Sequence, residues 1–246
     1  AKCPRWERFL LEVFEEDTDL IDYIQRAVGY SATAETKEQV WFLCHGAGQN
    51  GKSTFLDTIL LTLGDYGAVT GVDTLCGRTP FAMGTATPNI ASLQGKRFVS
   101  ASETDELEKL NAARIKAIVG GSPIAARHLH KNTFNFVPVC KLWLSTNHLP
   151  RVDDDSEGFW RRVRLIPFSR YFEEEERDKN LEADLKKELP GILRWIVMGA
   201  VKWYRDGLGS PLKIVMATTS YRMSSDPLTE FITDRCIQES GARATQ

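Results

Sequence analysis

The chain has 246 residues, of which 42% are hydrophobic and 26% charged, and its formal net charge is −2. This is the composition of a soluble chain that can build a full hydrophobic core. No apolar run approaches the roughly 20 residues that a membrane-spanning helix needs, and the start AKCPRWERFL does not resemble a signal peptide. We therefore expect a cytoplasmic protein without a membrane partner.

The cysteines are widely spaced, odd in number and never arranged as a C-x-x-C pair. Cys44 and Cys140 lie inside apolar runs that are typical of buried strands. Reduced core thiols are therefore favoured over disulfides or a zinc site.

The amino-terminal half alternates between helical and extended patterns. Residues 6–27 carry apolar side chains at helical spacing and predict two short helices. Compact apolar runs predict strands at 40–44, 97–101, 141–145 and 164–168, and a helix at 53–63 follows the first of them. Strands separated by helical segments favour a parallel sheet covered on both faces.

The carboxyl-terminal part is predicted to be helical. Residues 181–189 run into Pro190, which can open the next helix, and the tryptophans of that helix are predicted to be core residues. Ser210-Pro211 and Asp226-Pro227 each match a helix N-cap followed by proline in the first turn.

Residues 46–53, GAGQNGKS, match the phosphate-loop pattern G-x-x-x-x-G-K-[ST] between a predicted strand and a predicted helix. Backbone N–H groups of such a loop surround a phosphate, and the helix dipole adds positive potential. Lys52 is expected to contact the β- and γ-phosphates, and Ser53 to bind Mg²⁺. ATP and Mg²⁺ are thus the expected cofactors. The predicted nucleotide-binding residues are Gly46, Gly48, Gln49, Asn50, Gly51, Lys52, Ser53 and Thr54.

Polar residues follow two later strands. The run RFVSASE ends at Glu103, the candidate for activating water and assisting Mg²⁺ beside Ser53. Ser102 occupies the position where two adjacent acids would usually begin, so the sequence does not define the complete set of Mg²⁺ ligands. The run KLWLS continues into Asn147, whose amide is a candidate sensor of the γ-phosphate.

The run FWRRVR presents two arginines beside aromatic bulk. Arg162 is the first candidate and Arg161 the second for an arginine finger that a neighbouring subunit supplies to stabilise the transferring phosphoryl group. The alternative is that both contact DNA phosphates or pair with nearby acids.

Residues 109–151 contain no Asp or Glu, whereas acids gather at 153–155 and 173–176. This segregation predicts a cationic face for phosphates with acids on other faces, unless core strands alone deplete the acids. The basic residues of the segment are Lys109, Arg114, Lys116, Arg127, Lys131, Lys141 and Arg151.

Residues 120–132, GGSPIAARHLHKN, lie within this segment and raise a choice between a metal site and a basic finger. His128 and His130 have no third ligand nearby in sequence, which weakens the zinc interpretation. Gly120-Gly121 permits a tight turn, and alternation at 133–136 favours a hairpin with Lys131 near its tip.

In this order, the motifs GAGQNGKST, SASETDE, KAIVGGSPIAARHLHKNTFNF, KLWLSTNHLP and FWRRVRLIPF resemble the superfamily 3 helicases. The resemblance covers about residues 5–236 and is greatest to the carboxyl-terminal helicase domain of phage and plasmid primases, relatives of the poxvirus primase-helicase. It implies an AAA+-type P-loop NTPase core in a hexameric ring, with ATP between subunits, translocating 3′-to-5′ on single-stranded DNA in phage or plasmid replication within a bacterial host.

The resemblance also implies a hairpin that grips DNA in the ring channel, with Lys116, Arg127, His130 and Lys131 as its DNA-binding residues. Ser122 stands where such proteins often have Asp. Implied partners are single-stranded DNA, further copies of the chain, and a primase or polymerase module in the same or a partner chain. The implied division is an amino-terminal helical segment at 1–38, a P-loop ATPase/helicase core at 39–172 and a carboxyl-terminal helical segment at 173–246.

Two alternatives to a DNA helicase motor stay open at this point. One is a replication initiator or scaffold in which nucleotide binding only drives assembly. The other is a P-loop kinase acting on a small molecule, which would not explain the acid-free segment. Stimulation of ATP hydrolysis by single-stranded DNA distinguishes the motor from both.

Overall fold

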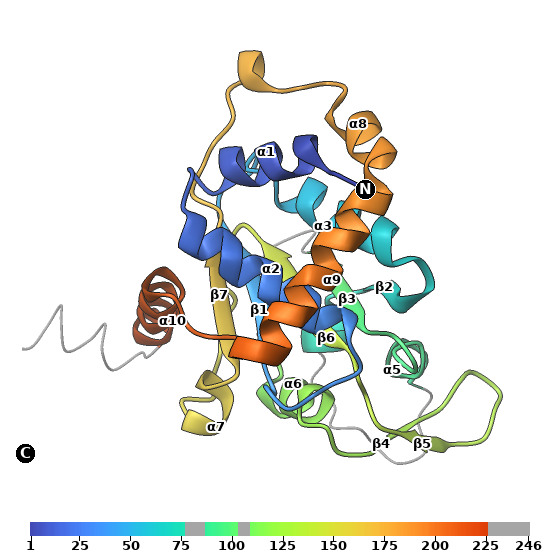
Figure 1. The fold of residues 1–246 in the computed structure, drawn as a ribbon. Helices are drawn as coiled ribbons and strands as arrows, with labels where there is room; N and C mark the ends of the chain where they lie inside the picture. Colours follow the sequence, from blue (N-terminus) through green and yellow to red (C-terminus); the bar gives the residue numbers. More distant parts are fainter. Residues whose placement is uncertain (77–86, 103–108, 226–246) are drawn as a thin grey trace, which may run out of the picture.

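The computed structural model describes residues 1–76, 87–102 and 109–225. Its centre is a five-stranded sheet in the order β2-β3-β6-β1-β7, in which all neighbouring strands are parallel (Figure 1). The strands are β1 (Trp41–His45), β2 (Gly67–Thr70), β3 (Phe98–Ser102), β6 (Lys141–Thr146) and β7 (Val163–Pro167). The predicted α/β class with a parallel sheet is therefore confirmed.

Both faces of the sheet are covered, because side chains alternate along a strand. In β1, Phe42 and Cys44 belong to one buried cluster, and Trp41 and Leu43 belong to the other. Helices α1 (Pro4–Val13), α2 (Thr18–Ala32), α3 (Lys52–Leu63), α8 (Leu181–Lys187) and α9 (Leu189–Asp206) contribute to the first cluster. Helices α4 (Asp73–Cys76), α5 (Pro88–Ala91), α6 (Ala112–Val119) and α7 (Glu157–Trp160) contribute to the second.

The remaining helical elements lie at the margins of the sheet. Helix α10 (Leu212–Ser224) packs against the edge strand β7, where the Thr218 hydroxyl accepts the Leu165 N–H at 3.1 Å. The short 3₁₀ helices are η1 (Gly64–Tyr66) and η2 (Glu174–Glu176). Across the described residues, no helix combines the length and apolar character that crossing a membrane would require.

Helices from the amino-terminal part and from the described carboxyl-terminal part build one layer together. The Trp6 and Trp195 rings lie edge to face with centroids 5.6 Å apart. Helices α2 and α9 cross so closely that a Cβ added at Gly29 would lie 2.0 Å from the Ala200 nitrogen. Glycine is thus required where these two backbones meet. The helices of residues 1–38 and 173–225 consequently share a core with the sheet.

Most predicted elements form within a few residues of their predicted bounds. The four predicted strands correspond to β1, β3, β6 and β7, and Pro190 lies in the first turn of α9, as expected. Trp195 and Trp203 are buried, and the four cysteines of the described residues are buried free thiols. The prediction at Ser210-Pro211 is wrong by one position, because Pro211 is itself the N-cap of α10. Asp226-Pro227 lies outside the described residues.

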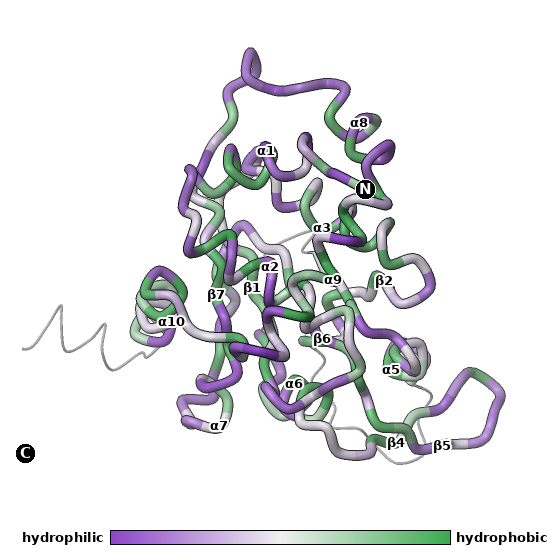
Figure 2. Tube along the Cα trace, in the orientation of Figure 1, coloured by the Kyte–Doolittle hydropathy of each residue, from purple (hydrophilic) through white to green (hydrophobic). Residues whose placement is uncertain are grey.

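A separate two-stranded antiparallel ribbon follows α6. It pairs β4 (Ile124–Ala126) with β5 (Phe134–Phe136) through the central register Ala125↔Asn135. The ribbon lies apart from the main sheet, and Figure 2 shows that most of the loop joining its strands is hydrophilic. The hairpin predicted from residues 120–136 is therefore present.

Lys141 corrects the predicted cationic face. It is the first residue of β6, and only 2% of its surface is exposed. Its Nζ donates to the carbonyl oxygens of Thr33 at 2.6 Å and Val139 at 3.0 Å, and it lies 4.6 Å from the centre of the Tyr30 ring. Loss of hydration on burial lowers the pKa of Lys141 to about 7, so this lysine belongs to the core and not to the surface.

We expect stability to rise with pH above neutrality because of Lys141. Between a folded pKa of about 7 and an unfolded value near 10.4, the unfolded chain binds the extra proton, which favours unfolding at the lower pH. From pH 7 to 9.5, the free energy of unfolding should increase by about 3 kcal/mol relative to the Lys141→Met variant. Urea unfolding of both proteins at the two pH values measures this difference, and parallel pH profiles would contradict it.

Candidate nucleotide and nucleic-acid sites

The phosphate loop lies between β1 and α3, where the carboxyl ends of three parallel strands meet. Register pairs His45 with Thr146 and Ser145 with Ser102, so β1, β6 and β3 end at one edge of the sheet. A cleft of about 350 Å³ opens at this edge. Its lining residues are Gly48, Gln49, Asn50, Gly51, Lys52, Ser53, Thr54, Ser102, Ser145, Thr146 and Asn147. The structure thus brings the phosphate loop and the predicted sensor to one site.

Lys52 is the charged centre of this cleft. Only 5% of the residue is exposed, and its Nζ donates to the Gly46 carbonyl, to the Asn50 Oδ1 at 3.1 Å and to the Asn147 Oδ1 at 3.1 Å. Burial lowers the pKa of Lys52 from its ordinary value near 10.5. Removal of water strengthens its field on any anion in the cleft. Lys52 and Asn147, 95 positions apart in sequence, are therefore in direct contact within the cleft.

Asn50 lines the cleft and also holds the loop together. Its side chain is buried and directed into the loop, where Nδ2 donates to the carbonyls of Ala47 and, at 3.2 Å, Phe168. Its Oδ1 accepts from Lys52. Asn50 therefore fixes the shape of the loop and the direction of Lys52.

Helix α1 supports the loop from behind. Gly51 has φ +84°, and a Cβ there would lie 2.8 Å from Val13 Cγ2 and 3.3 Å from Phe9 Cε2. Both the backbone conformation and the contact exclude a larger residue. This dependence of the phosphate loop on the first helix had no signal in the sequence.

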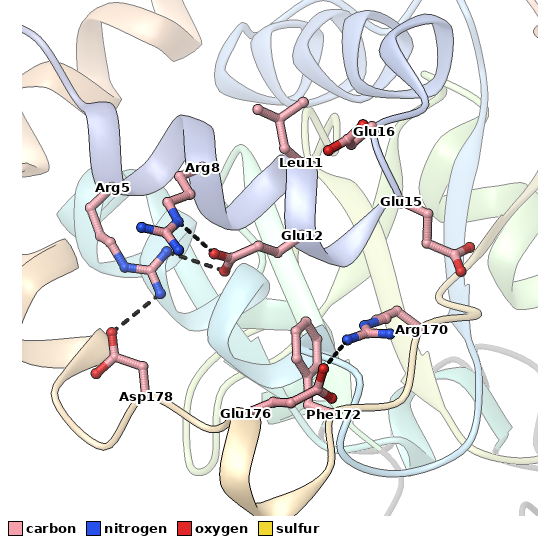
Figure 3. A pocket seen from close by; sticks show the side chains of 10 residues that line it. All are labelled: Arg5, Arg8, Leu11, Glu12, Glu15, Glu16, Arg170, Phe172, Glu176 and Asp178. Atoms are coloured by element: carbon pink, nitrogen blue, oxygen red, sulfur yellow. Dashed lines mark hydrogen bonds and ion pairs between the residues drawn. The ribbon is translucent and has the colours of Figure 1, made fainter.

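The segment after β7 encloses the other side of the loop. The Phe172 N–H donates to the Gln49 carbonyl at 3.0 Å, and Arg177 donates to the Gln49 side chain. A second cleft, of about 550 Å³, separates this segment from α1 (Figure 3). Ion pairs cross or line it: Arg5 with Glu12 and Asp178, both at 3.3 Å, Arg8 with Glu12 at 2.8 Å, and Arg170 with Glu176. Of these pairs, Arg5 with Asp178 connects α1 to the segment that covers the loop.

The donors around the cleft fit a hard cation. Ser53 is the second residue of α3, and it lines the cleft together with Ser102. Hydroxyl and phosphate oxygens are the ligand type that Mg²⁺ prefers. Among the described residues, no group of three His, Cys, Asp or Glu side chains could hold a metal by itself. Glu103 lies outside the described residues, so its predicted role in water activation and Mg²⁺ binding stays a prediction.

Arg161 and Arg162 lie at the opposite end of the strands from the phosphate loop, where β1 and β7 begin. The Trp41 N–H donates to the Arg162 carbonyl at 2.9 Å, which places the pair beside the start of β1, whereas the phosphate loop follows its end. Five residues of strand separate them by roughly 16 Å. Neither Arg161 nor Arg162 pairs with a carboxylate of the described segments; both donate instead to Gln39 Oε1, at 3.0 and 3.1 Å. Burial and the neighbouring Arg161 lower the pKa of Arg162.

Two of the four predicted DNA-binding residues lie at the tip of the hairpin. Lys131 and His130 are exposed there, and the Lys131 N–H donates to the His128 carbonyl at 3.2 Å to close the turn. His130 has φ +58°, a left-handed conformation. His128 stacks on Phe134 with ring centroids 5.4 Å apart, which gives it a packing role.

The other two lie elsewhere. Arg127 stands at the base of the hairpin, where its N–H donates to the Thr87 hydroxyl at 3.1 Å. Lys116 lies on α6 and pairs with Asp154 at 2.7 Å, and Lys109 pairs with Asp153. The prediction that the acids at 153–155 occupy another face is therefore wrong for Asp153 and Asp154.

Comparison with known proteins supports the resemblance inferred from the motifs. A family model described as "Family of unknown function (DUF5906)" matches residues 44–162. The chain is 26% identical to "Putative helicase L207/L206" of Acanthamoeba polyphaga mimivirus over 93% of its length. It is 27% identical to "Putative helicase 022R" of Frog virus 3 (isolate Goorha) and 25% identical to "Putative primase C962R" of African swine fever virus (strain Badajoz 1971 Vero-adapted), each over 96% of its length. The chain spans about a quarter of each relative, since these matches cover 25%, 26% and 27% of them.

A solved structure shares the fold. The A form apo structure of the NrS-1 C terminal region matches 98% of this chain and 60% of that chain, with a TM-score of 0.66 at 13% identity. The arrangement of sheet and helices is therefore that of a known protein. The resemblance to helicases and primases rests on the sequence relatives that carry those names.

Proposed function

We propose that the chain is the ATP-hydrolysing motor of a DNA helicase that acts in viral, phage or plasmid replication, assembled as a ring and moving 3′-to-5′ on single-stranded DNA. The observation that carries the proposal is the separation of two complementary parts. Lys52, Ser53 and Asn147 share one edge of the sheet, and the arginine pair stands roughly 16 Å away at the other edge. A second copy of the chain is needed to bring the two parts together.

In this mechanism each ATP lies between two subunits. The backbone N–H groups of residues 48–53 surround the phosphates, and Lys52 contacts the γ-phosphate, exchanging some of its present oxygen acceptors for phosphate oxygens. Asn147, held next to Lys52, senses the same phosphate. Mg²⁺, when bound through Ser53 and the phosphates, would neutralise charge on the phosphoryl group. Arg162 and Arg161 of the neighbouring subunit supply the remaining positive charge.

DNA contact is assigned to the hairpin. Its exposed tip carries Lys131 and His130, and its base is held to the body by Arg127. Lys116 can contribute only when its ion pair with Asp154 opens. A primase or polymerase module, in the same or a partner chain, would copy the strand that this motor exposes. If the motor serves phage or plasmid replication, DNA unwinding takes place in the bacterial cytoplasm.

Stimulation of ATP hydrolysis by single-stranded DNA tests the proposal. The Lys131→Ala variant tests whether the DNA contact lies at the tip of the hairpin. We expect this variant to keep basal ATP turnover, to bind DNA more weakly and to lose stimulation, because a phosphate contact is removed from the hairpin tip. The salt dependence of DNA binding should fall by about one unit in log–log slope. Fluorescence anisotropy with labelled oligonucleotide and a coupled ATPase assay provide both readouts.

Lys179→Ala is the matched control, because Lys179 is also exposed but lies in the loop before α8. It should behave like the unmodified chain. Unchanged DNA affinity in Lys131→Ala would refute the role of the hairpin. Absence of any stimulation by DNA in the unmodified chain would favour the initiator or scaffold, and phosphate transfer to a metabolite would favour the kinase.

A further inference from the structure

Gln39 occupies a junction between the two working parts of the molecule. It lies just before β1 with φ +52°, a left-handed conformation that is uncommon for a residue other than glycine. Its N–H donates to the Thr36 carbonyl at 3.0 Å, which closes a turn after α2. Non-glycine residues in this conformation are retained where the surroundings fix them, and often where a side chain must be directed.

Within the described part of the chain, the Gln39 side chain makes three polar contacts, and each leads to a segment with a proposed function. Its Oε1 accepts from Arg161 Nη2 at 3.0 Å and from Arg162 Nη2 at 3.1 Å. Its Nε2 donates to the Gly120 carbonyl at 3.1 Å. The partners decide the orientation of the amide, because guanidinium groups only donate and a carbonyl only accepts.

A neutral acceptor suits a pair of arginines that must act on a phosphate. A carboxylate at this position would offset their charge, whereas the amide oxygen aligns both guanidinium groups and leaves their charge intact. Arg162 is held further by its bond to the Gly158 carbonyl. The two like charges are thus kept side by side before any anion arrives.

The third contact reaches the hairpin. Gly120 is the C-cap of α6, and β4 begins four residues later at Ile124. The same turn touches the segment before Gln39, since a Cβ at Gly121 would lie 2.9 Å from the Thr36 hydroxyl. A displacement of the hairpin base would therefore be felt directly by the Gln39 amide.

We propose that Gln39 is a positioning residue that presents Arg161 and Arg162 to the ATP of the neighbouring subunit and couples their position to the hairpin through Gly120. This inference rests on the proposed function, because it assumes that the arginines act in trans. It adds a residue outside the phosphate loop, the sensor and the arginine pair, and it gives a physical connection between DNA contact and hydrolysis.

Mixed rings test on which side of the interface Gln39 acts. Lys52→Ala subunits can only donate arginines, and Arg162→Ala subunits can only donate the phosphate loop, so their mixture should regain ATP turnover. Adding Gln39→Ala to the Lys52→Ala donor should reduce the regained turnover by about tenfold, because misplaced arginines lose much of their effect. Adding it to the Arg162→Ala partner should leave the regained turnover within about twofold.

Steady-state kinetics on unmixed Gln39→Ala provide the second readout. We expect kcat with single-stranded DNA to fall about tenfold while the KM for ATP and the affinity for DNA stay unchanged, a division that general loss of structure would not give. Gln39→Glu keeps the shape of the side chain but pairs with the arginines and cannot donate to Gly120, so it should fold normally and show the same loss. Gln94→Ala, at an exposed glutamine, is the control.

The outcomes separate this inference from the function on which it rests. If the parent mixture regains turnover and the Gln39→Ala donor supports it fully, Gln39 has no positioning role. Equal losses from either side of the interface would also overturn the inference, because they indicate a general structural effect. If the parent mixture regains nothing, the arginines do not act in trans, and the role assigned to Gln39 falls with them.

Discussion

Replacement of Lys52 by alanine is expected to reduce ATP turnover at least 100-fold, to the background of the assay. The ammonium group is the buried cation at the centre of the phosphate cleft, within 3.1 Å of the Asn147 amide oxygen. No other lysine or arginine lines that cleft among the described residues, so its charge on the transferring phosphoryl group would not be replaced. A coupled assay at saturating ATP measures the loss.

Two controls separate chemistry from folding. Because Lys52 bonds several oxygens of its own loop, its removal leaves buried acceptors unpaired and can destabilise the chain by about 1–3 kcal/mol. Lys52→Met fills more of the same space without the charge, and thermal unfolding of both variants shows whether the fold is kept. Lys179→Ala should turn over ATP normally. Turnover near the normal rate in a folded Lys52→Met protein would remove the phosphate-loop assignment.

The parts of the site that could be predicted from the sequence are those whose residues are contiguous in one motif or directly follow a recognisable strand. The phosphate loop is one contiguous motif, so its glycines, Lys52 and Ser53 appear together wherever the chain folds as strand, loop and helix. Asn147 follows a recognisable apolar strand. Its contact with Lys52 then results from the parallel sheet, which brings the carboxyl ends of β1 and β6 to one edge.

Contacts between distant segments had no comparable signal. A glutamine before a strand is unremarkable by composition, and the role of Gln39 is visible only once Arg161, Arg162 and Gly120 surround it. Likewise, nothing local indicates that Val13 and Phe9 close the space behind Gly51. Strand β2 was missed because it is a four-residue edge strand, GAVT, with Val69 exposed and no continuous apolar run.

The distribution of charged residues along the sequence predicted the DNA-binding surface poorly, because it does not show which basic side chains are buried or paired with acids. Lys141 counted toward a basic surface but is buried under α2 residues, and Lys116 is partly neutralised by Asp154. Near the hairpin, the basic residues of the predicted cationic face that stay available lie at the tip and the base of the hairpin. Substitution of Lys131 is therefore a more informative test of DNA binding than substitution of Lys116.

Mixing Arg162→Ala with Lys52→Ala subunits is expected to restore ATP turnover that neither variant has alone. Each competent site then takes its phosphate loop from one variant and its arginines from the other. In a ring with head-to-tail interfaces, about one quarter of the sites are competent in an equal mixture, so turnover should approach about a quarter of the unmodified value. The separation of roughly 16 Å between the arginine pair and its own loop is the structural reason.

The dependence on mixing ratio distinguishes action in trans from action in cis. If the arginines act on the neighbour, turnover follows the product of the two fractions and is greatest near the equal mixture. If Arg162 serves its own subunit, every mixture stays at the low level of the two variants. Arg194→Ala, an exposed arginine on α9, is the matched control and should be active alone. Repeating the series with Arg161→Ala shows which arginine is the finger. The finger is the arginine whose replacement abolishes turnover in the unmixed variant and is complemented by Lys52→Ala. The other arginine then aligns the finger through their shared contact with Gln39.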